Sequence, residues 1–138
     1  MVKPITLTDV LKPGFIDHLI ETSIWQAKPL SEQPVVELIR WQVMQLPNGD
    51  RHFVGWNIAG SEGRTTSKLV EFDAVTRRGW TSSGREYRLL GLTGKDIDGV
   101  YTWQRWMKVT GNTSAIEVSQ DFQTLSNAAQ VLGLESAK

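Results

Sequence analysis

The sequence has 138 residues and no cysteine, and it carries 15 basic and 15 acidic side chains. This length suits one domain with a single hydrophobic core, and the lack of cysteine excludes disulfides, thiolate metal ligands and a cysteine nucleophile. The neutral formal net charge argues against a protein that binds nucleic acid through its whole surface. The apolar runs are too short for a membrane helix and the first twenty residues lack a secretion signal, so we expect a cytoplasmic protein with a single domain over residues 1–138.

The N-terminal part of the chain, residues 1–34, is expected to form a short helix and a connector. Pro13 suits the first turn of a helix, and the apolar residues that follow it recur at spacings of three and four. This pattern predicts a helix over residues 13–22. Residues 27–34 contain two prolines and several polar side chains, which is typical of an ordered connector.

Alternating apolar residues over 35–59 predict a β-hairpin. Its centre contains Asn48-Gly49, a pair that favours a two-residue turn because both central residues need positive φ. Such a turn sets the register and places Trp41 opposite Trp56 on one apolar face. We therefore expect these two tryptophans to be buried neighbours in the core.

A second group of strands is expected after a loop at residues 60–63. The predicted strands are residues 68–72, 77–82 and 85–90. A Ser-Gly turn between the last two opposes Trp80 with Tyr87, an aromatic pair across neighbouring strands. The two groups together predict five antiparallel strands in sequence order.

Residues 92–138 are expected to be mainly helical. Asp96 is a suitable N-cap, and the apolar spacing after it predicts a helix over residues 97–109. Gly111 lies where a glycine commonly ends a helix.

The end of the chain completes the predicted fold. Residues 115–118 suit a short sixth strand, and an apolar stripe then predicts a last helix that ends at Gly133. Together these elements predict an α+β domain: an antiparallel meander sheet of five to six strands over residues 35–91, with helices packed on one face.

The charges are unevenly distributed along the chain. Residues 64–108 carry nine basic and five acidic side chains, whereas the segments before and after each have two more acidic than basic ones. An exposed aromatic side chain among arginines can stack on bases or anchor a protein interface. The candidate binding residues are Arg77, Arg78, Trp80, Arg85, Tyr87, Arg88 and Trp106. Strand alternation is expected to split them between two faces of the sheet, with Trp80 and Tyr87 on the same face.

No local motif for catalysis or cofactor binding occurs in the sequence. Residues 91–96 contain glycines and a lysine, but they lack the spacing and the hydroxyl residue of a phosphate-binding loop. Residues 96–99 match only part of a calcium-binding loop, whose other oxygen ligands are missing. The two histidines, His18 and His52, lie on different predicted elements without a nucleophile motif. We therefore expect no catalytic residue, no metal site and no cofactor.

One stretch of the sequence combines turn, basic and aromatic residues in a particular order. It comprises Thr81-Ser82-Ser83-Gly84-Arg85-Glu86-Tyr87-Arg88-Leu89-Leu90-Gly91, followed by Tyr101-Thr102-Trp103 and Trp106. This order resembles a pattern found in small uncharacterised bacterial proteins, some of them associated with mobile elements. The resemblance covers less than a quarter of the chain, and it implies a bacterial origin without a particular activity.

These observations are compatible with three classes of function. The leading prediction is a non-enzymatic binding or accessory protein that engages a protein partner or a second copy of itself. The alternative is a nucleic-acid-binding accessory protein that uses the basic segment 64–108, and the third is an enzyme of unrecognised family. Because the basic excess is small, nucleic-acid binding is expected to be weak at physiological salt. No membrane partner is expected.

Overall fold

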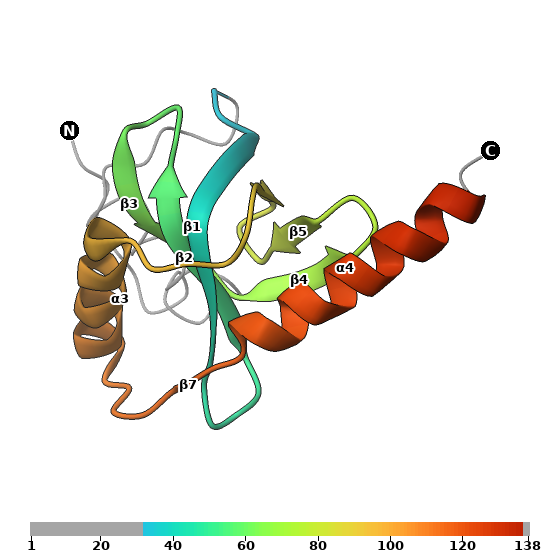
Figure 1. The fold of residues 1–138 in the computed structure, drawn as a ribbon. Helices are drawn as coiled ribbons and strands as arrows, with labels where there is room; N and C mark the ends of the chain where they lie inside the picture. Colours follow the sequence, from blue (N-terminus) through green and yellow to red (C-terminus); the bar gives the residue numbers. More distant parts are fainter. Residues whose placement is uncertain (1–31, 137–138) are drawn as a thin grey trace.

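The computed structural model describes residues 32–136, with side chains described as far as residue 132. The predicted helix 13–22 and most of the predicted connector lie outside the described residues. The strands are β1 (Val35–Gln45), β2 (Arg51–Asn57), β3 (Glu62–Thr65), β4 (Leu69–Asp73), β5 (Arg78–Thr81), β6 (Glu86–Leu89) and β7 (Ile116–Glu117). The helices are α3 (Ile97–Thr110) and α4 (Ser119–Ser136) (Figure 1).

The predicted α+β class with a mostly antiparallel sheet is confirmed. The strand order is β3-β2-β1-β6-β5-β4, and β7 adds a short pairing to β1. Two details differ from the expected meander. The pair β1–β6 is parallel, and β3 forms partly within the segment 60–63 that its glycines and polar residues led us to expect as a loop.

The register of the first hairpin differs by one residue from the prediction. Leu46 donates its N–H to the carbonyl of Asp50 at 2.8 Å, and Gly49 donates to the carbonyl of Leu46 at 2.9 Å. The loop therefore has three residues, of which Gly49 alone has positive φ (95°), as in a type I turn followed by a glycine bulge. Consequently Val43 pairs with Phe53.

The prediction that Trp41 and Trp56 are buried neighbours is wrong. A bulge between Ile39 and Gln42 shifts the register, and Trp56 pairs with Ile39. At this bulge Arg40 has a φ of 48°. Trp41 is fully buried in the core, whereas Trp56 is half-buried on the opposite face of the sheet, where α3 packs.

The two ends of the sheet are joined by a sharp corner. Only residues 66–68 separate β3, at one end of the strand order, from β4 at the other. On one side of this corner Thr66 N–H donates to the carbonyl of Phe53 in β2, and on the other Ser82 N–H donates to the carbonyl of Lys68, each at 2.9 Å. The sheet is therefore rolled. Its two ends meet at this corner, where the chain stops pairing with β2 and begins to pair with β5.

Two hydrophobic clusters lie on opposite sides of β2. The inner cluster is enclosed by the rolled sheet and contains Val36, Leu38, Trp41, Val43, Phe53, Tyr87, Leu89 and Phe122. The outer cluster lies under α3 and contains Leu46, Val54, Trp103 and Trp106. Because neighbouring residues of β2 belong to different clusters, α3 and α4 contact opposite faces of this strand.

The helix ends explain where the two helices begin and stop. The side chain of Asp96 accepts a hydrogen bond from the Gly99 N–H, and Gly111 caps the C-terminus of α3 with a φ of 73°, as predicted. The Ser119 hydroxyl, at the start of α4, accepts from the Val43 N–H at 2.8 Å. The predicted end at Gly133 is wrong, because α4 continues to Ser136; its C-terminal half extends past the sheet (Figure 1).

Candidate functional site

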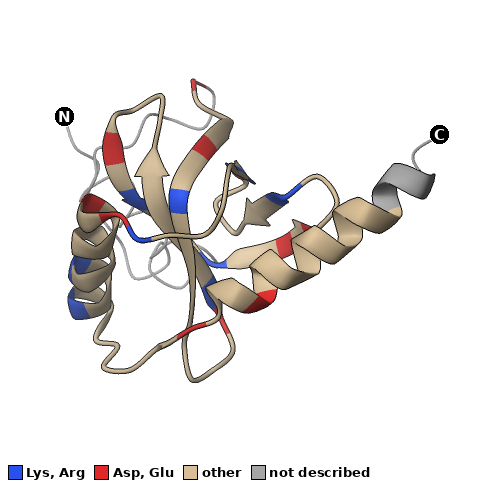
Figure 2. Cartoon of the chain, in the orientation of Figure 1, with Lys and Arg blue, Asp and Glu red and all other residues tan. Residues whose placement is uncertain are grey.

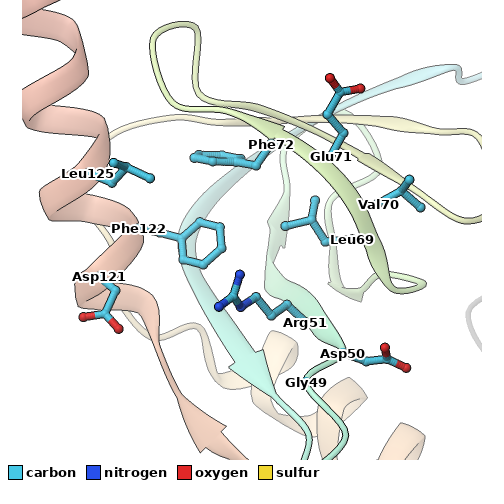
Figure 3. Close-up of a pocket in the computed structure, with 10 residues that line it drawn as sticks. All are labelled: Gly49, Asp50, Arg51, Leu69, Val70, Glu71, Phe72, Asp121, Phe122 and Leu125. Carbon is cyan, nitrogen blue, oxygen red and sulfur yellow. The ribbon is translucent and has the colours of Figure 1, made fainter.

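A hollow of about 390 Å³ opens between the first hairpin, β4 and the start of α4 (Figure 3). It is lined by Gly49, Asp50, Arg51, Leu69, Val70, Glu71, Phe72, Asp121, Phe122 and Leu125. We call this hollow the groove. Its residues come from three segments far apart in the sequence, so the fold alone brings them together.

The corner at residues 66–68 creates the groove. Up to Thr66 the strand is paired with β2, but beyond the corner β4 pairs with β5 instead. The start of β2 around Arg51 and the body of β4 therefore diverge, and α4 closes the third side of the gap (Figures 1 and 3). β4 ends the strand order, so its outer backbone edge has no strand partner within residues 32–136.

The floor of the groove is apolar and aromatic. Phe122 reaches from α4 into the inner cluster, where its ring centroid lies 5.0 Å from that of Phe72 and 6.4 Å from that of Phe53. Leu69 and Leu125 flank this ring in Figure 3. Leu125 is 55% exposed, so part of the apolar floor remains open to solvent.

Arg51 forms one wall of the groove. Its guanidinium carbon lies 5.5 Å from the Phe122 ring centroid, and its Nε donates to Gln45 Oε1 at 2.9 Å. No carboxylate within the described part of the chain forms an ion pair with Arg51. Its remaining N–H groups can therefore donate to carbonyl or carboxylate oxygens of a ligand.

The rim of the groove is acidic. Three carboxylates line it, those of Asp50, Glu71 and Asp121, and Figure 3 shows them pointing away from its apolar centre. Figure 2 shows the acidic positions on β4 and at the start of α4 beside the single basic position of β2. Three acids against Arg51 give the lining an excess of negative charge, which favours a positively charged ligand around an apolar centre.

Three of the predicted binding residues are buried. Tyr87 is fully buried and accepts a hydrogen bond from Arg64 Nη1 at 3.4 Å. Trp106 is 4% exposed and stacks on Trp103 with ring centroids 5.1 Å apart. Arg85 is also buried, and its Nη1 donates to the Gln33 carbonyl at 2.6 Å.

Arg77 is also occupied by contacts within the chain. It has a φ of 58°, its Nη2 donates to the Gly91 carbonyl, and its guanidinium carbon lies 5.9 Å from the Trp41 ring centroid. Partial burial lowers the pKa of Arg77. These contacts give Arg77 a structural role at the edge of the inner cluster.

The other three predicted residues share the outer face of β5 and β6. Arg78 pairs with Arg88, and Trp80 pairs with Glu86. Tyr87 lies instead in the inner cluster, so the prediction that Trp80 and Tyr87 pair on one face is wrong, although the candidate residues are divided between two faces. Glu86 Oε2 lies 2.8 Å from Arg88 Nε and 3.8 Å from Arg78 Nη1. This carboxylate offsets part of the positive charge that was expected to define a binding surface.

Sequence reasoning missed every residue of the groove. The predicted surface followed a local excess of arginine, whereas the groove combines a hairpin loop, an edge strand and a helix start. The apolar stripe of the last helix gave no signal either, because the exposure of Leu125 is visible only in the structure.

Searches for a metal site, a membrane helix and similar proteins add no further candidate. Among residues 32–136, no three His, Cys, Asp or Glu side chains gather where they could hold a metal ion. In the same part of the chain no helix has the length and apolar character needed to cross a membrane. The sequence matches no protein-family model. Searches of curated proteins and of solved structures found no match either, and the resemblance to small bacterial proteins stays a prediction.

Proposed function

We propose that this protein is a non-enzymatic binding protein that holds an extended segment of a protein partner in the groove. The observation that carries this proposal is the hollow with its apolar floor beside the edge of β4 that has no strand partner within residues 32–136. An added strand would satisfy the open N–H and C=O groups of that edge, which is a common mode of peptide recognition. Val70, which is 67% exposed on β4, would then be covered.

The apolar floor supplies the specificity for a side chain of the partner. Alternate side chains of an added strand point to the same side, so one of them can enter the hollow between Leu69, Phe122 and Leu125. Full burial of a large apolar side chain contributes about 1.5–3 kcal/mol. This burial supports a moderate affinity, which the backbone hydrogen bonds at β4 would supplement.

The acidic rim supports a partner segment with basic residues beside the apolar one. The carboxylates of Asp50, Glu71 and Asp121 would attract lysine or arginine, while Arg51 can donate to a carbonyl of the bound backbone. Because the carboxylates are at the rim, we expect them to raise the association rate more than the final affinity.

A titration followed by amide NMR tests the proposal. The probe is a blocked seven-residue peptide that alternates lysine with valine or leucine, and the comparison peptide carries glutamate in place of lysine. We expect the lysine peptide to shift the amide signals of β4 and of the start of α4, and to bind at least about tenfold more tightly than the glutamate peptide.

Two matched variants on α4 locate the binding. Leu125→Asp places a charge at the groove, whereas Val131→Asp places the same charge on an exposed residue further along the helix. Both side chains are more than half exposed, so both variants should fold. The expected result is loss of binding in Leu125→Asp alone. Equal binding by both variants, or shifts that avoid β4, would refute the proposal.

A further inference from the structure

A second hollow of about 360 Å³ lies on the other face of β2, beside the first turn of α3. It is lined by Trp56, Ser61, Glu62, Gly63, Asp98, Tyr101 and Thr102. We call it the aromatic pocket. It shares no lining residue with the groove, so a ligand in the aromatic pocket would be independent of the proposed function.

Gly63 explains why the aromatic pocket exists. It pairs with Trp56 across β2 and β3, so β3 places no side chain directly beside the indole. A Cβ on Gly63 would lie 2.2 Å from the carbonyl carbon of Asp98, so only glycine lets the first turn of α3 approach this closely. The same turn brings Asp98 and Tyr101, three residues apart on one helix face, to the pocket.

The Trp56 ring already interacts with a cation. The guanidinium carbon of Arg40 lies 5.8 Å from the Trp56 ring centroid, and its Nε is held by Asp96 Oδ1 at 3.0 Å. Arg40 does not line the pocket. Tyr101, which is 59% exposed, supplies a second aromatic ring. Tryptophan and tyrosine faces attract cations through their negative quadrupole.

The carboxylates of the aromatic pocket add to this attraction. Glu62 is balanced by the fully buried Arg64, whose Nη2 lies 2.9 Å from Glu62 Oε1. Asp98 is exposed and has no ion pair within residues 32–136. One carboxylate without an ion pair therefore lies next to two aromatic rings in the pocket, and its charge opposes that of the helix N-terminus.

We infer that the aromatic pocket is a binding site for an organic cation, specifically a methylated alkylammonium group. Such a group has few or no N–H donors, so aromatic faces and one carboxylate can replace its hydration, whereas a bare ammonium needs three acceptors. The same chemistry occurs in a small molecule such as choline and in a methylated lysine of a protein.

An NMR titration with three ligands tests this inference. Choline and blocked trimethyllysine represent the two sources of the cation, and 3,3-dimethylbutanol is the uncharged carbon analogue of choline. We expect at least one cation to shift the Trp56 indole signal and the amide signals around Asp98 and Tyr101. The analogue should bind about tenfold more weakly or not at all, because it lacks the charge.

Exposed variants keep the test independent of folding. Tyr101→Ala and Asp98→Asn should each weaken cation binding several-fold, whereas Glu37→Gln, which removes an exposed carboxylate that lines neither hollow, should leave it unchanged. A response to choline alone assigns a small molecule and a response to trimethyllysine alone assigns a protein side chain; both support the inference. Equal shifts with the uncharged analogue, no shift with either cation, or binding that survives both pocket variants would overturn it.

Discussion

Replacement of Gly63 by alanine tests the packing of α3 on the sheet. The added Cβ would lie 2.2 Å from the Asp98 carbonyl carbon and 2.3 Å from its oxygen, which are backbone atoms that cannot rotate away. Normal carbon contacts need about 3.5–4.0 Å, so the first turn of α3 must move by more than an ångström. The Asp96 cap and the hydrogen bond between the Thr65 and Thr102 hydroxyls, 2.9 Å long, resist that movement.

We expect Gly63→Ala to lower the free energy of unfolding by about 3 kcal/mol, at the upper end of the range for overpacking. The measurement is urea denaturation followed by far-ultraviolet circular dichroism, with the slope of the transition compared between proteins. Gly111→Ala is the control, because a Cβ there meets nothing within 4 Å and the residue has only an unfavourable φ of 73°, at a cost of about 1–2 kcal/mol. A Gly63→Ala protein that is less destabilised than the control would refute the reasoning.

Three further predictions concern the core, one carboxylate and nucleic acid. Trp41→Ala should cost about 3–5 kcal/mol of stability in thermal or urea denaturation, and clearly more than Trp56→Ala, because only Trp41 is fully buried; equal costs would contradict this. Hydrogen bonds from Thr76, first of all from its side chain, hold the pKa of Asp73 below its ordinary value. The stabilisation by the ionised carboxylate is therefore present above the unfolded pKa and lost as pH falls through the folded one; an NMR titration of Thr76→Ala should show the pKa of Asp73 rising. Random single- or double-stranded nucleic acid should bind no tighter than micromolar in fluorescence anisotropy at about 150 mM salt, and nanomolar binding would contradict this.

The strands and helices within the described residues were largely predictable, but the registers of the two hairpins were not. The same type of loop explains both register errors. In the first hairpin Leu46 N–H donates to Asp50 and Gly49 N–H donates back to Leu46. In the second, Thr81 N–H donates to the Arg85 carbonyl and Gly84 N–H to that of Thr81, so both loops have three residues ending in a left-handed glycine. A residue followed by glycine fits this loop as well as the two-residue turn. Local sequence does not distinguish them.

The groove could not have been predicted for a different reason. It depends on the corner at residues 66–68 and on the parallel pair β1–β6, which brings β5 and β4 around the core. Both are long-range features, since a parallel pair leaves no turn signature in the sequence. Lys68 was expected to begin a strand, whereas in the structure Thr66, Ser67 and Lys68 transfer the chain from one ladder to another.

The corner has a mechanical consequence for the two hollows. β3 and β4 are parts of one continuous stretch of chain, and only five residues, 64–68, separate Gly63 in the lining of the aromatic pocket from Leu69 in the lining of the groove. Thr65, just before the corner, is tied to α3 through Thr102, and Ser67 within it is tied to Ser83 at 3.2 Å. The two hollows are thus joined by one short stretch of backbone whose hydrogen bonds reach α3 on one side and the turn after β5 on the other.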